Sequence, residues 1–274
     1  MSGISVIIVT HNSAKVIGRC LDALARQQYP PGEIVLVDSG SDDPSYLEQY
    51  SGHERIRLLF LQKNVGFARA NNIGYGQCAG DSEYVLYLNP DAFLQKTTLK
   101  LSRQCLIENQ NCGVVGGRLL GWDLEAGKAS GLLDSTGIFR KWYGRWVDRG
   151  QGERDHGQFL RQESVPALCG AFLFCRRSAL ERIRLAEGVF FDPDFFLYKE
   201  DIELSIRMRK YGYGLLYNPD IRVFHCRGWR ARKEMEFKQR LLAAKSELLL
   251  YRKHPSPYIC WALFKYLLVR CLRL

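Results

Sequence analysis

Strongly apolar segments alternate with segments of helical periodicity in the first half of the chain. Four runs of mostly β-branched or large apolar residues predict strands at 4–9, 34–37, 56–61 and 84–88, the first of them buried. Apolar residues recur at helical spacing over 16–24, where Ser13 is a candidate N-cap, and again over 67–78. This alternation predicts an α/β fold with a mostly parallel sheet and helices on both faces.

The pattern weakens in the middle of the chain. Residues 120–165 are rich in glycine, charged residues and tryptophan, and predict a long loop with a functional role. The elements predicted beyond it are a strand at 170–175, a helix at 201–211 and short strands at 214–217 and 221–224.

The last part of the chain is predicted to be helical. Apolar residues recur at helical spacing over 230–253, and a proline-containing break ends this helix. A second helix is predicted over 258–274, with Lys265, Arg270 and Arg273 on one side and leucine and phenylalanine residues on the other.

Charge is unevenly distributed along the chain. The formal net charge of the 274 residues is +10, yet residues 227–274 alone hold 12 Lys and Arg against 3 Glu. We expect residues 1–228 to form a folded body, with halves at about 1–117 and 118–228, and residues 229–274 to form a basic helical appendage. Because the positive charge is confined to this tail and no recognition motif accompanies it, no nucleic-acid partner is expected.

Composition excludes several classes of protein. Hydrophobic residues make up 46% and charged residues 25%, which suits a chain that buries a core and excludes a disordered or fibrous protein. The nine cysteines are scattered without zinc-ligand spacing, and no apolar run reaches the roughly 18 residues that a membrane-spanning helix needs. A strand that begins at Ile4 leaves no room for a signal peptide. We therefore expect a reduced, cytoplasmic protein.

Polar residues follow each predicted strand of the first half. They are Thr10 to Asn12, Asp38 to Ser41, Asn64 with Gly66, and Asn89 to Asp91. In parallel α/β sheets, ligands bind at the carboxyl ends of the strands. The first turn lacks the glycines of a dinucleotide-binding fingerprint, and no P-loop motif occurs. A bound diphosphate would then be neutralised by a divalent cation held on a carboxylate.

Four positions stand out chemically, and each has a structural alternative. Asp91 could hold a metal or cap a helix that begins near residue 97. Asp38 could contact a base or ribose, or stabilise a turn. Asp201 follows an aromatic segment that would raise its pKa, but acids at the start of a helix are also favoured by the helix dipole. His225 ends a strand, where it could be a metal ligand or a structural residue.

Seven motifs occur together over most of the chain, in an order shared with a known family. They are Ser5–Asn12, Val35–Asp42, Asn64–Gly74, Leu88–Asp91, Cys169–Ala171, Tyr198–Asp201 and His225. In these motifs the sequence resembles the family 2 inverting glycosyltransferases of the GT-A fold, particularly bacterial rhamnosyltransferase-like members.

The resemblance implies a role for each motif. The residues that it assigns to nucleotide-sugar binding are Thr10, His11, Asn12, Asp38, Ser39, Asn64, Gly66, Phe67, Asn72, Asn89, Gly170 and Glu200. It implies Asp201 as the catalytic base, and Asp91 and His225 as ligands of Mn²⁺ or Mg²⁺. Asn89 stands where the family has the first acid of its D-x-D motif, and a neutral amide there lowers the expected metal affinity.

The implied activity is metal-dependent, inverting glycosyl transfer in cell-surface glycan synthesis. The donor would be a dTDP- or UDP-sugar, with rhamnose as a candidate sugar, and the acceptor a glycan or a lipid-linked glycan. Two alternatives stay open. A sugar nucleotidyltransferase usually needs a basic, glycine-rich loop, and none follows Val9. A nucleotide-sugar-binding or membrane scaffold protein without catalysis would not need Asp91, Asp201 and His225.

The basic tail suggests where the protein acts. A helix with one charged and one apolar side suits peripheral binding to the anionic inner face of the cytoplasmic membrane. The alternative is a last helix that packs on its own domain and leaves its basic edge in solvent.

Overall fold

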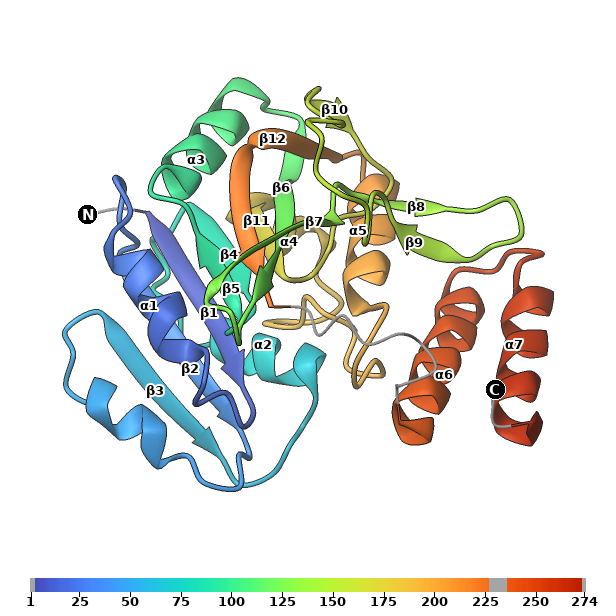
Figure 1. Ribbon diagram of the computed structural model, residues 1–274, viewed down its shortest axis with the longest axis horizontal. Coiled ribbons are helices and arrows are strands. Elements are labelled where there is room, and N and C mark those ends of the chain that lie inside the picture. The colour runs from blue at the N-terminus through green and yellow to red at the C-terminus, as the bar shows by residue number, and fades with distance from the viewer. Residues whose placement is uncertain (1–2, 227–235, 273–274) are drawn as a thin grey trace.

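The structure is a computed structural model that describes residues 3–226 and 236–272. Its centre is a 10-stranded mixed sheet with the order β10–β12–β6–β11–β4–β1–β2–β3, in which β5 also pairs with β12 and β7 with β6 (Figure 1). The strands are β1 (Ile4–Thr10), β2 (Glu33–Ser39), β3 (Ile56–Leu61), β4 (Tyr84–Leu88), β5 (Ala92–Leu94), β6 (Cys112–Asp123), β7 (Lys128–Ser135), β8 (Ile138–Arg140), β9 (Trp146–Asp148), β10 (Glu163–Ser164), β11 (Phe172–Arg176) and β12 (Gly214–His225). The helices are α1 (Ile17–Ala25), the 3₁₀ helix η1 (Ser45–Tyr50), α2 (Phe67–Tyr75), α3 (Thr98–Glu108), α4 (Arg177–Ile183), α5 (Glu200–Lys210), α6 (Phe237–Lys253) and α7 (Ile259–Leu272).

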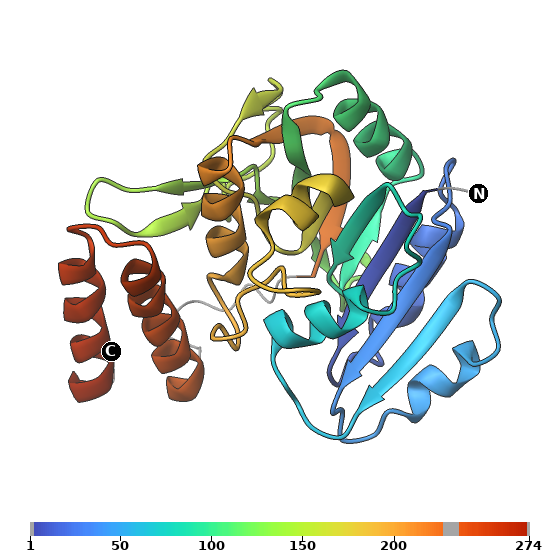
Figure 2. The same ribbon diagram turned by 180° about the vertical axis from the view of Figure 1, so that it is seen from behind.

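The first half forms the predicted parallel layer. β4, β1, β2 and β3 pair in parallel, and the apolar runs of β1, β2 and β4 are buried because helices cover both faces, whereas the outermost strand, β3, is only partly buried. Helices α1 and α3 pack in one core cluster, and α2, α4 and α5 contribute to the cluster on the opposite face (Figure 2). The sequence-based expectation of an α/β sheet flanked by helices is confirmed.

The second half adds strands of mixed direction. β11 lies between β4 and β6 and is antiparallel to both. β12 runs parallel to β6 and antiparallel to β5, which places His225 opposite Ala92. This register brings the end of β12 beside Asp91, although the two residues are far apart in the sequence.

The middle of the chain is more ordered than its pattern predicts. Instead of one long loop at 120–165, β6 continues to Asp123, β7 returns along it, and β8 pairs with β9 in a separate hairpin. The two short strands predicted at 214–217 and 221–224 are one strand, β12, with an irregularity between Asn218 and Arg222. Local periodicity missed both features because the strands are short or interrupted and depend on their partners for pairing.

Two expectations about helix ends are wrong. The side chain of Ser13 does not cap α1: its hydroxyl pairs with His11, and α1 begins only at Ile17. Asp91 does not cap α3, because β5 intervenes and α3 follows Thr97.

The C-terminal helices α6 and α7 form an antiparallel hairpin beside the sheet domain (Figure 1). The predicted start of the first helix at residue 230, the expected boundary at 228 and the side chain of Arg273 lie outside the described residues. Lys265 does not belong to a solvent-facing stripe, since it turns inward to the buried carboxylate of Glu247. Over residues 3–226 and 236–272, no helix combines the length and apolar character needed to span a membrane.

Candidate functional site

The carboxyl ends of the parallel strands and the end of β12 form one edge of the sheet. Thr10, which ends β1, pairs in register with Asp38 on β2, and Leu88, which ends β4, pairs with Ile8 on β1. The residues predicted for the donor site therefore lie along neighbouring strand ends.

Asp38 orders the loop that follows β2. Its buried carboxylate accepts hydrogen bonds from the hydroxyl of Thr10 at 3.1 Å, from the backbone N–H of Ser41 at 2.9 Å and from the hydroxyl of Tyr46 at 3.3 Å. The turn alternative thus has direct support, and contact of Asp38 with a base or ribose stays a prediction.

The loops after β1 and β2 are tied together at the surface. The ring of His11 pairs through Nδ1 with the carbonyl of Ser39 at 3.0 Å. Asn12 donates to the carboxylate of Asp42 at 2.9 Å and accepts from its backbone N–H at 2.9 Å. His11 and Asn12 are both exposed, so they are held in place and remain accessible to a ligand.

The start of the Asn64–Gly74 segment forms the turn that precedes α2. Asn64 accepts from the backbone N–H of Gly66 at 2.9 Å and from the hydroxyl of Ser39 at 3.3 Å, which fixes the turn before α2. Gly66 has φ 83°, and a Cβ there would lie 2.4 Å from the carbonyl oxygen of Phe196, so glycine is required.

Asn72, on α2, makes its contacts away from the strand ends. Its side-chain oxygen accepts from the backbone N–H groups of Phe190 and Phe191, both at 3.0 Å, and its nitrogen donates to the carbonyl of Phe191 at 2.7 Å. All three contacts hold the 190–191 segment. Contact of Asn72 with a nucleotide sugar stays a prediction.

Three polar side chains meet where β12 ends. Nε2 of His225 lies 3.2 Å from Oδ1 of Asp91 and 3.3 Å from Nδ2 of Asn89, while Nδ1 lies 2.8 Å from Oδ2 of Asp134. The side chain of Asp134 is fully buried and that of His225 is 6% exposed, whereas that of Asp91 is 27% exposed. The cluster is therefore closed on the Asp134 side and open on the Asp91 side.

The charge of His225 is set by its two acidic neighbours. Burial alone would lower the pKa of the imidazole, but the carboxylates of Asp91 and Asp134 outweigh burial and raise it to about 9. Asp134 also fixes which ring nitrogen faces Asp91, because it occupies Nδ1.

Sequence reasoning missed Asp134. It ends a short apolar run on β7, in the region read as a loop, and nothing local distinguishes it from other acids there. Asp148, on β9, was also missed, and its charge contributes to the environment of Asp201.

Asp201 occupies the first turn of α5, beside the same sheet edge. Its carboxylate accepts from the backbone N–H of Gly170 at 2.9 Å and from its neighbour Ile202 at 2.8 Å. The residue after Gly170, Ala171, accepts at 3.1 Å from the backbone N–H of Asn89. A short path of backbone and hydrogen bonds therefore links Asp201 to the Asp91–His225 pair.

The approach to α5 is conformationally unusual. Tyr198 and Lys199, immediately before the helix, have φ values of 71° and 73°, a region that residues with a side chain seldom adopt. Two such residues in succession turn the chain so that Glu200 and Asp201 face inward as the helix begins. Strain of this kind concentrates at functional sites.

Comparison with known proteins decides the family. The sequence profile described as glycosyl transferase family 2 matches residues 5–184, more than half of the chain. The chain belongs to this family. It is a family 2 glycosyltransferase with a GT-A fold.

Relatives and solved structures agree with this assignment. An N-acetylglucosaminyl-diphospho-decaprenol L-rhamnosyltransferase of Mycobacterium tuberculosis is 25% identical over 80% of the chain and 75% of its own length. A poly(ribitol-phosphate) β-N-acetylglucosaminyltransferase, TarS of Staphylococcus aureus, is 34% identical over 36% of the chain, but the match spans only 18% of TarS. GalNAc-T7, solved with UDP, GalNAc and Mn²⁺, superposes with a TM-score of 0.72 at 16% identity over 97% of the chain and 50% of its own.

The two acids that begin α5 of this glycosyltransferase have altered acidity. Burial, together with the charge of Asp201, raises the pKa of Glu200 to about 8, against a smaller opposing effect of Lys199. Burial also raises the pKa of Asp201, and the N–H of Gly170 partly offsets this. A carboxylate with a raised pKa is a stronger base once ionised.

The side chains of Asp91 and His225 suit a divalent cation. A carboxylate and an imidazole nitrogen are suitable ligands, and a buried carboxylate on the second ring nitrogen is the usual support for a metal-bound histidine. Among the described residues, no group of three or more His, Cys, Asp and Glu is arranged to hold a metal. Asp91 and His225 thus fit as a pair of ligands to which a bound diphosphate would add oxygens.

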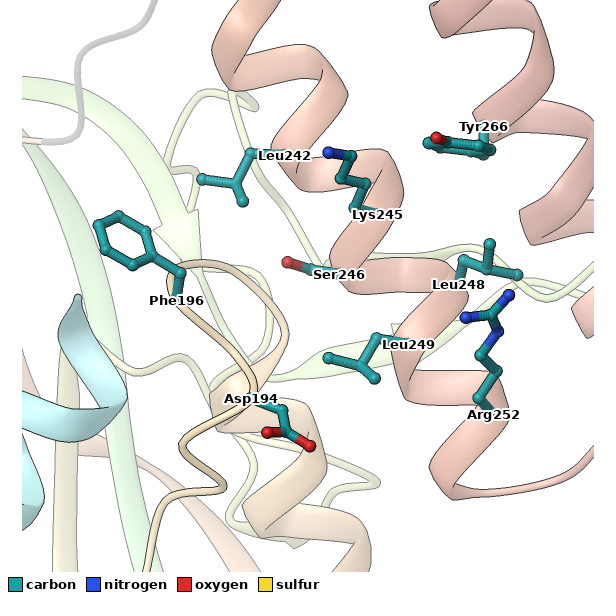
Figure 3. Close-up of a pocket in the computed structure, with 9 residues that line it drawn as sticks. All are labelled: Asp194, Phe196, Leu242, Lys245, Ser246, Leu248, Leu249, Arg252 and Tyr266. Carbon is teal, nitrogen blue, oxygen red and sulfur yellow. The ribbon is translucent and has the colours of Figure 1, made fainter. Parts of the chain in front are cut away.

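A groove outside the sheet edge lies along α6 (Figure 3). Its volume is about 390 Å³, and Asp194 and Phe196 from the segment before α5 form one side. Lys245 and Arg252 project from α6 between leucine side chains, and Tyr266 of α7 completes the lining. The carbonyl of Phe196 accepts at 2.9 Å from the N–H of Phe67, so the segment that borders the groove also contacts the start of α2.

Proposed function

We propose that this enzyme transfers a sugar, with inversion, from a nucleotide-diphosphate sugar to a hydroxyl of a cell-surface glycan precursor. The observation that carries the proposal is the hydrogen-bonded path that runs from Asp201 through Gly170, Ala171 and Asn89 to His225, the partner of Asp91. A base and a diphosphate-binding pair on one sheet edge are what a single displacement requires, because the acceptor must attack opposite the leaving group.

The chain's own residues supply most of the chemistry. Asp201, ionised, accepts the proton of the acceptor hydroxyl as that oxygen attacks the anomeric carbon. The N–H groups of Gly170 and Ile202 keep its carboxylate oriented. Asp91 and His225 would hold Mn²⁺ or Mg²⁺, which when bound supplies stabilisation of the negative charge on the departing nucleoside diphosphate.

The donor and its contacts are part of the proposal. We place the nucleotide against the loops that follow β1 and β2, where His11 and Asn12 are accessible. We propose a dTDP- or UDP-sugar with rhamnose as a candidate: the name of the mycobacterial relative, which matches 80% of the chain, supports rhamnose, and GalNAc-T7, solved with UDP, supports a uridine nucleotide. Mannosyltransferase PcManGT of Pyrobaculum calidifontis, solved with GDP-Man and Mn²⁺, has a TM-score of 0.62 at 20% identity over 98% of this chain and 70% of its own, so a guanine nucleotide belongs in any screen.

We also propose that the acceptor is a lipid-linked glycan. The name of the mycobacterial relative specifies a diphospho-decaprenol acceptor, and the groove along α6 offers Lys245 and Arg252 beside leucine side chains. This pairing suits a diphosphate that carries an apolar chain. We further propose that residues 1–228 are the catalytic unit, that 229–274 are an appendage, and that the protein works on the inner face of the cytoplasmic membrane.

Substitution of Asp201 tests the proposed reaction. Donors are first screened by thermal shift with Mn²⁺, using dTDP-rhamnose, UDP-sugars and GDP-mannose. With the donor that binds, Asp201→Asn should lower transfer by about 10²–10⁴-fold and leave donor affinity within a few-fold, because the base acts on the acceptor. Asp220→Asn, at an exposed position on β12, is the matched control and should retain full activity.

Near-normal transfer by Asp201→Asn would exclude it as the base. If instead no donor binds and no hydrolysis of donor occurs with Mn²⁺ present, the alternative of a non-catalytic scaffold protein is favoured. Release of inorganic diphosphate from a nucleoside triphosphate would indicate a sugar nucleotidyltransferase.

A further inference from the structure

Two segments that are distant in the sequence meet at one end of the molecule. The turn of the β8–β9 hairpin lies beside the first turns of α7 in both views (Figures 1 and 2). The ring of Tyr143, in the turn, packs edge-on against Trp261 of α7 at 4.9 Å. Trp142 packs edge-on against Tyr143 at 5.3 Å, and Trp261 lies 6.0 Å from Phe264.

This group of side chains is largely exposed to solvent. Trp142 is 86% exposed and Phe264 54%, and the neighbouring Leu263 and Leu267 of α7 are 46% and 47% exposed. We call the six residues Trp142, Tyr143, Trp261, Leu263, Phe264 and Leu267 the aromatic tip. A contiguous apolar surface of this kind on a soluble domain usually marks an interaction site.

The orientation of α7 explains why its outer face is apolar. Its most buried residues, Ala262 and Val269, turn toward α6. Lys265 also turns that way, because its ammonium group pairs with the fully buried Glu247 of α6. Because Lys265 is paired between α6 and α7, the outer face of α7 is left with exposed leucine and phenylalanine side chains. Of the three cations expected on one side of this helix, Lys265 thus turns inward and Arg270 is exposed, and Arg273 lies outside the described residues.

The charge around the aromatic tip is positive. Residues 138–147 and 259–272 contain five Lys and Arg and no Asp or Glu. Of these five, Lys141 and Arg270 are exposed and Arg145 is half-buried. Exposed aromatic rings beside cations, without acids, match the chemistry of an anionic bilayer surface, where Trp and Tyr lie among headgroups and cations meet phosphates.

The aromatic tip is presented on a fixed support. The hydroxyl of Tyr251, on α6, donates to the carbonyl of Gly144 in the hairpin turn. Gly144 has φ 102°, and a Cβ there would lie 2.6 Å from the side chain of Tyr258, so the turn sits directly on the α6–α7 connection. The guanidinium of Arg140 stacks on Tyr258 at 4.4 Å. The exposed rings therefore do not require a folding step to reach a bilayer, which limits the entropic cost of binding.

We propose that the aromatic tip inserts into the headgroup region of an anionic lipid bilayer and attaches the enzyme to the membrane surface. The hairpin contributes the most exposed ring, Trp142, and α7 contributes the adjoining apolar face. This assigns membrane contact to the sheet domain and the appendage jointly, rather than to a basic stripe on the last helix. The proposal is independent of donor and acceptor identity, so its failure leaves the proposed transfer reaction untouched.

Vesicle sedimentation with the full chain tests the proposal. The probes are vesicles of phosphatidylcholine with 30% phosphatidylglycerol and vesicles of phosphatidylcholine alone. Trp142→Ala should weaken partitioning onto the anionic vesicles by roughly tenfold, because a large apolar ring is withdrawn from the interface. Lys141→Gln with Arg270→Gln should weaken it by about tenfold or more and reduce its dependence on salt. Phe60→Ala, which removes a ring 51% exposed on β3, is the matched control and should bind as the wild type does.

Fluorescence measures insertion directly. Brominated lipids should quench the tryptophan emission of the wild type, and Trp142→Phe should lose much of that quenching. Circular dichroism and donor hydrolysis confirm that each variant is folded. Unchanged partitioning of Trp142→Ala and of the charge variant would overturn the proposal. So would sedimentation velocity that shows Trp142→Ala dissociating a dimer while vesicle binding stays the same, since the tip would then bind a second copy of the chain.

Discussion

Two groups of largely buried polar side chains, each with one histidine and at least one carboxylate, can be compared within this molecule. At the sheet edge, His225 lies between Asp91 and Asp134. Between α5 and α6, His254 contacts Glu203, which also pairs with Arg207. The first group is open to solvent at Asp91, whereas the side chains of Glu203 and Arg207 are only 3% and 7% exposed.

The difference in partners separates a site from a structural link. Arg207 directs its N–H groups to Glu203, at 2.6 Å and 3.0 Å, and to the carbonyls of Ile183 and Phe190. These contacts hold α5 against the segments around it and leave the guanidinium no access to a ligand. His225 instead presents Nε2 toward Asp91 at an accessible strand end. Burial and ion pairing alone therefore do not identify a functional acid. The group must also be accessible to a ligand from solvent.

The largest expected effect lies in the structural link. Arg207→Met removes the cation from beside Glu203, and leaving a buried carboxylate unpaired costs about 3–5 kcal/mol of unfolding free energy. The measurement is urea unfolding followed by circular dichroism. The double variant Glu203→Gln with Arg207→Met should recover part of the loss, because it removes the buried charge as well. Equal losses in the single and double variants would show that the ion pair is not the source of the stability.

A smaller effect is expected at the sheet edge. Asp134→Asn should weaken Mn²⁺ binding by about 10–100-fold in the presence of a nucleoside diphosphate, because the residue that orients a metal-bound histidine is lost. Titration calorimetry measures this without any need for turnover. Ser135→Ala, at the next and equally buried position of β7, is the control and should bind Mn²⁺ normally. Wild-type affinity in Asp134→Asn would show that His225 is positioned without it, or is not a ligand.

Comparison of these regions shows what the sequence could and could not predict. The parallel strands, and the positions of Asp91, Asp201 and His225 at element ends, follow from local patterns, because buried strands and turn residues have a local signature. Asp134 could not be found, since its significance comes from β7 pairing with β6, which itself pairs with β12. The inward turn of Lys265 was missed for a related reason. The sequence predicts the arc of the helix on which Lys265 lies, but which side of α7 faces α6 depends on Glu247, a buried acid on another helix.

The last expected effect concerns the acids at the start of α5. The folded state raises the pKa of Glu200 to about 8, mainly by burial and then by the charge of Asp201, with Lys199 opposing. The unfolded chain has an ordinary glutamate pKa near 4.3, so the folded state binds the proton more tightly. Folding stability should therefore fall as pH rises from about 4 to 8. The pKa of Asp201 is also raised, mainly by burial and in part by the charge of Asp148, so Asp201 contributes a pH dependence of the same sign.

Glu200→Gln should flatten this dependence in urea unfolding measured across that range, because a neutral amide does not titrate. An unaltered slope in Glu200→Gln would mean that other groups produce the pH dependence, and that Glu200 is ionised in the folded enzyme at neutral pH. Glu200 would then resemble Glu203, whose pKa is lowered by His254 and Arg207 against the effect of burial.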